Sequence, residues 1–173
     1  MCRLYLKFPT LEDKDNVLDF KSEFLASGQR MAGVSGLDKI EIFEDWLERI
    51  NKDLFRESCG EGRVPSTLYL TYKSKDNKLV GIVQIRHELN ENLLNYGGNI
   101  GDSIRPSEQN KGYGTEQISL ALEKCRELKM NKVLITCFKS NIASARTIQK
   151  NNGILENEVF DNGELKQRYW IGL

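Results

Sequence analysis

The sequence IRPSEQNKGYGT, residues 104–115, decides how the rest of this chain is interpreted. It begins as the end of an extended apolar segment and finishes as the first turn of an amphipathic helix. Between the two lies a loop with glycines at positions 112 and 114. Glycine has no Cβ, so its backbone can approach a bulky ligand closely and adopt a positive φ. The helix directs unpaired N–H groups at this loop and Lys111 adds a cation, so we expect a phosphate or pyrophosphate ligand there.

Three phosphate-binding motifs are possible at this loop, and two of them do not fit. A P-loop ends in Gly-Lys-Ser/Thr, whereas here Lys111 precedes the glycine. A dinucleotide fingerprint requires a glycine three positions after Gly114, where this chain has Gln117. The remaining pattern is Gln/Arg-x-x-Gly-x-Gly/Ala, which reads Gln109-x-x-Gly112-x-Gly114. A glycine-rich turn before an ordinary helix gives the same spacing, so the rest of the chain must decide.

Apolar spacing predicts strands and helices in the order β–α–α–β–β–β–α–β–α–β–β. The expected strands are 3–8, 67–72, 78–86, 99–105, 132–138, 154–160 and 164–172. The expected helices are 11–25, 38–55, 115–129 and 141–150, and residues 87–94 form a loop or one helical turn. The strand at 132–138 is almost continuously apolar, which is typical of an interior strand covered on both faces. Asn162-Gly163 predicts a hairpin between the last two strands. We expect a single domain over residues 1–173.

The second predicted helix carries acidic side chains at Glu41, Glu44, Asp45 and Glu48, with Trp46 among them. The acids can form a solvated helix face, or they can attract a cationic amine substrate. Trp46 can be a half-exposed core residue or a wall of a substrate site.

Composition limits the classes of function. Lys+Arg and Asp+Glu both number 25, and no basic stripe with interleaved aromatics occurs, so we expect no nucleic-acid partner. No apolar run can span a bilayer and the N-terminus resembles no signal peptide, so we expect a cytoplasmic protein without a membrane partner. Cys2, Cys59, Cys125 and Cys137 form no metal or redox motif, and the last two are expected in the core. His87 is the only histidine, so we expect neither a metal site nor a Ser-His-Asp triad.

The glycine loop and the element order together resemble the GNAT superfamily of N-acetyltransferases. The resemblance covers essentially the whole chain, and Asn141-Ile142-x-Ser144, directly after the strand ending at 138, is its second motif. Both motifs resemble the branch described only as predicted acetyltransferases. The resemblance implies an α/β (α+β) fold, with a mixed central sheet of about seven strands flanked by helices on both faces. It also implies acetyl-CoA as co-substrate, no metal, and a small-molecule or peptide amine as acceptor.

The resemblance further implies a set of cofactor-binding residues. The pyrophosphate would contact Gln109, Asn110, Lys111, Gly112, Tyr113, Gly114 and Thr115. Backbone groups of Ser103, Ile104 and Arg105 would pair with the pantetheine, and an N–H near Ile104 would polarise the acetyl carbonyl. Asn141 would contact the pantetheine arm or its bound water, and Ser144 or Arg146 would lie near the phosphate or adenosine end. Asn141 is also a plain helix N-cap in sequence terms, and the two roles can coexist.

The implied chemistry is direct attack of a neutral amine on the thioester, which needs a base for the ammonium proton and a donor for the thiolate. Many members of the family have a tyrosine as the donor in the last helix, but this chain has Ile148 there. Where some members place a glutamate on the fourth strand, this chain has Gly98. The candidate bases are Asp102 and Glu88, with His87 and Tyr96 behind them. Asp102 can equally be a surface-facing strand residue.

We therefore expect an acetyl-CoA-dependent N-acetyltransferase acting on a primary amine. The alternative is a GNAT-fold module that binds acyl-CoA without efficient turnover, which the isoleucine at position 148 favours. We expect a monomer or a homodimer, because the segment 167–173 with Trp170 can pair across a dimer or close the sheet.

Overall fold

The computed structural model describes residues 3–173, so Cys2 and the first residues of the N-terminal segment that resembles no signal peptide lie outside the described range. The strands are β1 (Leu4–Lys7), β2 (Ser66–Lys73), β3 (Leu79–Arg86), β4 (Ile100–Ile104), β5 (Lys132–Phe138), β6 (Ile154–Asp161) and β7 (Glu164–Gly172). The α-helices are α1 (Lys14–Ser27), α2 (Phe43–Lys52), α3 (Tyr113–Glu127) and α4 (Ile142–Lys150). Three short helical turns are η1 (Leu11–Asp13), η2 (Leu93–Gly97) and η3 (Pro106–Glu108). The predicted order of strands and α-helices is confirmed.

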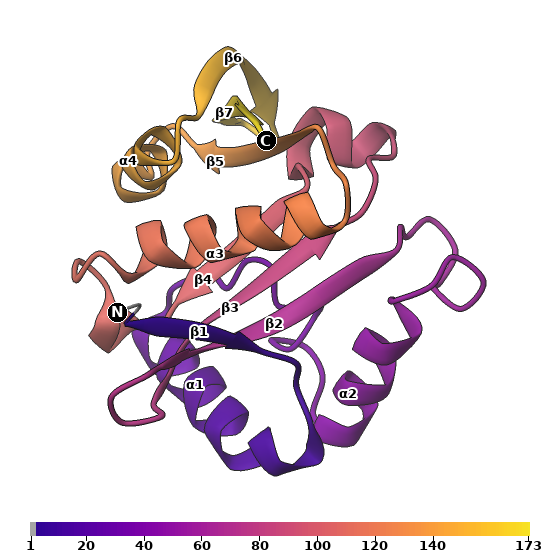
Figure 1. Ribbon diagram of the computed structural model, residues 1–173, viewed down its shortest axis with the longest axis vertical. Helices are drawn as coiled ribbons and strands as arrows, with labels where there is room; N and C mark the ends of the chain where they lie inside the picture. The colour runs from indigo at the N-terminus through magenta and orange to yellow at the C-terminus, as the bar shows by residue number, and fades with distance from the viewer. Residues whose placement is uncertain (1–2) are drawn as a thin grey trace.

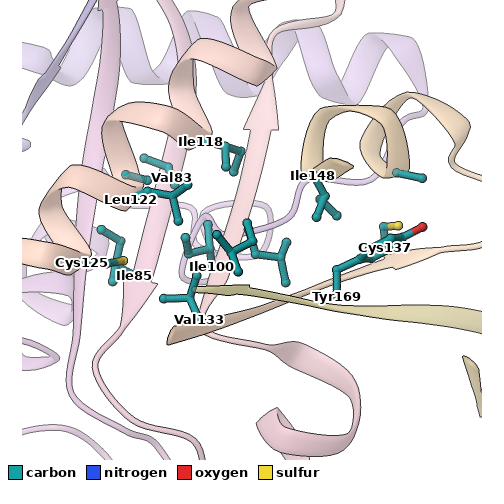
Figure 2. Close-up of a cluster of buried hydrophobic side chains, with 14 residues drawn as sticks. Val83, Ile85, Ile100, Ile118, Leu122, Cys125, Val133, Cys137, Ile148 and Tyr169 are labelled. Atoms are coloured by element: carbon teal, nitrogen blue, oxygen red, sulfur yellow. The ribbon is translucent and has the colours of Figure 1, made fainter. Parts of the chain in front are cut away.

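The strands form one mixed sheet in the order β1-β2-β3-β4-β5-β7-β6, with helices on both faces as predicted (Figure 1). Helices α1 and α2 cover one face, where Phe20 and Trp46 pack with Ile82. Helices α3 and α4 cover the other face, where Ile118 packs with Val83 and other buried side chains (Figure 2). Ile82 and Val83 are neighbours in β3, so the period-2 alternation of a strand supplies both cores.

Strands β4 and β5 separate along most of their length. They are the parallel pair of the sheet, and their register includes a single position, Ile100 opposite Ile135. Asn99 closes the vertex: its N–H donates to Leu134 O (2.7 Å) and its Oδ1 accepts from Leu134 N (2.8 Å). Beyond this point β5 pairs with β7 and β4 pairs with β3, so the sheet opens between β4 and β5.

Helix α2 is shorter than the predicted 38–55 helix. The N–H groups of Lys39 and Ile40 both donate to Gly36 O, which forms a separate turn before the helix begins at Phe43. Trp46 is completely buried, and its Nε1 donates to Val34 O (2.8 Å), so it belongs to the core. Glu41, Glu44, Asp45 and Glu48 are exposed, and Glu44 pairs with Lys14.

Residues 87–94 were predicted as a loop or one helical turn; residues 87–90 are loop, and the helical turn begins at 91 and continues through η2. Gly98 follows it at φ 69°, and a Cβ at this position would lie 2.6 Å from Leu134 O, so a glycine is required. The predicted hairpin at 161–163 is confirmed, with Asn162 and Gly163 at φ 50° and 86° as a type I′ turn requires. Strand β7 pairs with β5 and with β6, so Trp170 lies in an interior strand that closes the sheet.

None of the helices within residues 3–173 is long and apolar enough to cross a membrane.

Candidate functional site

A groove of about 560 Å³ lies where β4 and β5 separate. One wall is formed by β4 and the glycine loop, and a second by the first turns of α4. The end of α1 and the link that follows it, through Gln29, Arg30 and Ala32, form a third wall. Ala32 is fixed to β4, because its N–H donates to Ser103 Oγ (2.7 Å) and its carbonyl accepts from the same hydroxyl (2.8 Å).

The glycine loop presents free backbone donors to this groove. Gly112 is the N-cap of α3 at φ 83°, and the first helical bond runs from Glu116 N to Gly112 O. Within residues 3–173, the N–H groups of Tyr113, Gly114 and Thr115 have no protein acceptor. Such groups and the helix dipole favour an anion, so the loop has the backbone geometry of a phosphate site.

Two side chains of the loop brace it from within. Gln109 Nε2 donates to Ile104 O (3.0 Å) and to Gln29 Oε1 (2.8 Å). Lys111 Nζ is directed back to Glu108 (2.9 Å) and to the carbonyl of Ser107. Lys111 therefore does not line the groove, contrary to the prediction of a cation beside the phosphates.

The cations of the groove come instead from Arg30, Arg146 and Lys150. Arg146 and Lys150 are exposed on α4, and neither has an ion-pair partner within residues 3–173. Sequence reasoning proposed Arg146 and missed Lys150, although the four-residue spacing on a helix places both side chains on one face.

The main chain of β4 has one side in the sheet and one in the gap. Arg105 N donates to Val80 O (2.8 Å), so by strand alternation the main-chain N–H and C=O of Ser103 also face β3. The main-chain groups of Asp102 and Ile104 consequently face the gap. The guanidinium of Arg105 is buried on the face of the sheet that α1 covers, where it pairs with Asp19 (2.6 Å). The predictions that Ser103 and Arg105 pair with a ligand through their backbones do not fit this geometry, because the main-chain groups of both residues face β3 and the Arg105 N–H is already bonded.

Asn141 and Ser144 both line the groove. Asn141 Oδ1 accepts from Ser144 N (3.1 Å), which confirms its N-cap role for α4. The Asn141 amide nitrogen has no protein partner within residues 3–173, so the cap leaves a donor on the groove side.

Of the candidate bases, Asp102 is the one that lines the groove. Its Oδ2 accepts from Gln117 Nε2 (3.3 Å), and burial raises the pKa of this carboxyl to about 6. Such a pKa suits a general base near neutral pH. The expectation of a surface-facing strand residue does not fit this position.

The other candidate bases lie elsewhere. Glu88 follows β3, is exposed, and forms an ion pair with Arg56, so its assignment as a base is not supported by its position. His87 Nε2 lies 2.9 Å from Thr67 Oγ1, and burial lowers its pKa. Tyr96 contributes its carbonyl to Thr136 Oγ1 (2.8 Å), and like Glu88 and His87 it does not line the groove.

The opened sheet and the glycine loop are features of one known family. The family model described as an acetyltransferase (GNAT) domain matches residues 3–153. The chain belongs to this GNAT family. Acyltransferase activity with acetyl-CoA as co-substrate goes with this assignment, which confirms the resemblance seen in the sequence.

Solved structures share the GNAT fold over the full chain at low sequence identity. RimL, a ribosomal alpha-N-protein acetyltransferase in complex with coenzyme A, has a TM-score of 0.72 and 15% identity, covering 100% of this chain and 96% of its own. MccE, a microcin C7 self-immunity acetyltransferase in complex with acetyl-CoA and AMP, has a TM-score of 0.71 and 16% identity, with coverages of 99% and 93%. A SpeG spermidine N-acetyltransferase chimera from Vibrio cholerae has a TM-score of 0.67 and 17% identity, with coverages of 98% and 95%. A sequence comparison with curated proteins finds no significant match.

This GNAT chain has no proton donor at position 148. Ile148 is buried beneath α4 and points onto the sheet toward Tyr169 and Cys137 (Figure 2). Cys137 is buried as predicted, and burial raises the pKa of its thiol, which hydrogen-bonds with Ser144. Ile148 is thus a core residue, in one buried cluster with Tyr169 and Cys137.

Proposed function

We propose that this chain is an acetyl-CoA-dependent N-acetyltransferase that moves an acetyl group to a primary amine. The observation that carries the proposal is the groove itself, which combines free N–H groups at the start of α3 with the Asp102 carboxyl. The N–H groups suit the pyrophosphate of acetyl-CoA, and the carboxyl suits a base that deprotonates the amine attacking the thioester.

The pyrophosphate is proposed to bind the N–H groups of the first turn of α3, from Gly112 to Thr115. Arg146 and Lys150 supply positive charge from α4, which makes the site attractive to phosphate oxygens. The pantetheine is proposed to run along the gap side of β4, where the main-chain groups of Asp102 and the N–H of Ile104 act like the edge of a sheet, while Gln109 holds the Ile104 carbonyl. Gln109, Asn110 and Tyr113 are proposed to shape the loop, and Asn141 and Ser144 to contact the arm from α4.

In the proposed reaction, Asp102 accepts a proton from the acceptor's ammonium group, which leaves a neutral amine. The amine nitrogen forms a bond to the acetyl carbon as the carbon–sulfur bond breaks. An N–H of β4 facing the gap stabilises the charge on the carbonyl oxygen. The thiolate of coenzyme A takes up the proton that the nitrogen loses as the amide forms, so the products are an amide and a thiol.

The acceptor is proposed to be a primary amine of a small molecule or peptide. Two structures with the same fold carry names that specify amine substrates, an alpha-amino group of a ribosomal protein and spermidine. Both are amines, which supports the class of acceptor and leaves its identity open.

A second candidate is a module that binds acyl-CoA without efficient turnover, and the buried Ile148 favours it. The two are separated by titrating acetyl-CoA calorimetrically and then measuring release of free thiol with a panel of amines. Binding with amine-dependent thiol release supports the enzyme, whereas binding without release across the panel supports the module. Absence of binding contradicts both.

A further inference from the structure

Gln117 lies in the second turn of α3 and is completely buried beside Asp102. Its Nε2 is 3.3 Å from Asp102 Oδ2 and 3.5 Å from the carbonyl of Ile82. Its Oε1 is buried and has no hydrogen-bond partner within residues 3–173. A buried amide with one unsatisfied end lowers stability, and an apolar side chain of similar shape would avoid that loss. The amide is therefore present for its N–H donor.

Strand β3 makes room for this amide. A Cβ at Gly81 would lie 2.0 Å from Gln117 Oε1, which is closer than any ordinary contact. Gly81 has a backbone conformation that other residues also adopt. A glycine is needed here because any side chain would occupy the space of the Gln117 amide. A glycine in a strand interior costs conformational entropy, and here it allows a polar side chain to reach β4.

Asp102 is held differently from the other shielded carboxylates. Asp13 pairs with Lys7, Asp53 with Arg63, and Glu108 with both Lys78 and Lys111. Within residues 3–173, Asp102 has no cationic partner and only the neutral amide of Gln117. A neutral donor orients a carboxylate without a full opposite charge, so it lowers the proton affinity less than a lysine or arginine does.

The second oxygen of this carboxylate is free. Asp102 Oδ1 has no hydrogen bond within the described residues and is not among the fully buried unsatisfied atoms, so it remains accessible from the groove. The ionisable side chains that share the groove are Arg30, Glu108, Arg146 and Lys150, and the Cys137 thiol lies near Asp102 on β5. Neither α3 nor β3 presents a charged side chain to Asp102, and Gln117 is the polar contact from α3.

We propose that Gln117 is a positioning residue for Asp102: its amide binds Oδ2 and thereby directs Oδ1 toward the acceptor amine. This inference rests on the proposed function, in which Asp102 is the base. Gln117 touches neither co-substrate nor acceptor, and it acts through the orientation and proton affinity of Asp102.

The test is Gln117→Met, which keeps the length of the side chain and removes the donor. Loss of a hydrogen bond to the charged form raises the pKa of Asp102, so the acidic limb of kcat/KM moves to higher pH. We expect kcat to fall at least about tenfold at pH 7, because a displaced base is poorly oriented, while KM for acetyl-CoA is unchanged. Leu122→Met, on the same buried face of α3, is the control and leaves the limb in place.

A second readout does not depend on turnover. NMR titration of carbon-labelled aspartate, assigned with Asp102→Asn, reports the Asp102 carboxyl directly. Gly81→Ala displaces the Gln117 amide without changing that residue, so it shifts the same titration upward and serves if Gln117→Met fails to fold. An unchanged Asp102 titration in either folded variant overturns the positioning role. Absence of wild-type turnover with a shifted titration contradicts the proposed function alone.

Discussion

Replacing Gly112 with aspartate tests the phosphate site most directly. Gly112 caps α3 and lines the groove, and a Cβ there would lie 3.4 Å from Arg3 Nη2. Gly112→Asp therefore places a carboxylate beside the proposed pyrophosphate site, where the Arg3 guanidinium offsets part of its charge. Two unit charges 4 Å apart repel by about 4 kcal/mol at the effective dielectric constant of a protein surface. Salt and solvent reduce this repulsion, and about 2.7 kcal/mol of it corresponds to a hundredfold change in affinity. We therefore expect acetyl-CoA to bind at least about a hundredfold more weakly.

The same substitution changes stability much less. Gly112 has φ 83°, and a side chain in this left-handed region costs about 1–2 kcal/mol. An acidic residue at a helix N-terminus contributes about 0.3–1 kcal/mol in the opposite direction. The net loss of about 1 kcal/mol lowers Tm by about 2–4 °C for a chain of this size.

The assay is calorimetric titration of acetyl-CoA, with thermal unfolding measured on the same samples. Gly62→Asp is the matched control, since Gly62 also has a positive φ (72°), nothing lies within 4 Å of a Cβ added there, and it does not line the groove. Wild-type affinity in Gly112→Asp would refute the phosphate site. An equal loss in Gly62→Asp would show that added charge or lost stability, rather than position, weakens binding.

Four further results are expected. Asp102→Asn lowers kcat about a hundredfold or more with little change in acetyl-CoA affinity, as steady-state kinetics and calorimetry will show. Burial raises the pKa of Asp102 to about 6, so above pH 6 its ionisation lowers the free energy of unfolding by up to about 3 kcal/mol. Urea unfolding should therefore find Asp102→Asn more stable than the wild type at pH 8 but not at pH 4. Ile148→Tyr overpacks the core, so it lowers the free energy of unfolding by about 1–3 kcal/mol and does not raise kcat. A stable variant with a higher kcat would contradict the assignment of position 148 to the core. Arg146→Ala with Lys150→Ala weakens acetyl-CoA binding and reduces its dependence on salt, whereas Arg126→Ala leaves both unchanged.

Regular spacing made most of the fold predictable. The apolar alternation and the Asn162-Gly163 turn predicted the sheet and its last hairpin, because local propensity and tertiary packing agree there. The second helix was predicted too long, because its apolar spacing continues back to Ile40. In the structure, residues 36–40 form a separate turn and the helix begins only at Phe43. Periodicity records which face is buried and does not record where a turn interrupts the backbone.

The candidate site was predictable where it depends on backbone and unpredictable where it depends on side-chain partners. The glycines of the loop and the cap at Asn141 have local signatures, and the structure brings them into one groove. The pairing of Lys111 with Glu108 and the exclusion of Glu88 depend on which atoms meet in three dimensions. In the sequence, Gln117 was notable only because it stands where a dinucleotide fingerprint has its third glycine. Nothing in the local sequence indicates that its amide reaches Asp102 on another strand.

The single-position contact between β4 and β5 has a mechanical consequence. Strands β1–β4 and strands β5–β7 each form a continuous antiparallel ladder, and the two ladders meet at Ile100 and Ile135. Two such half-sheets can flex about their shared vertex, and a ligand that contacts both resists that motion. Binding would then couple the two halves into one cooperative unit. Amides of 101–104 and 136–138 would exchange with deuterium in concert in the bound protein and independently in the free one.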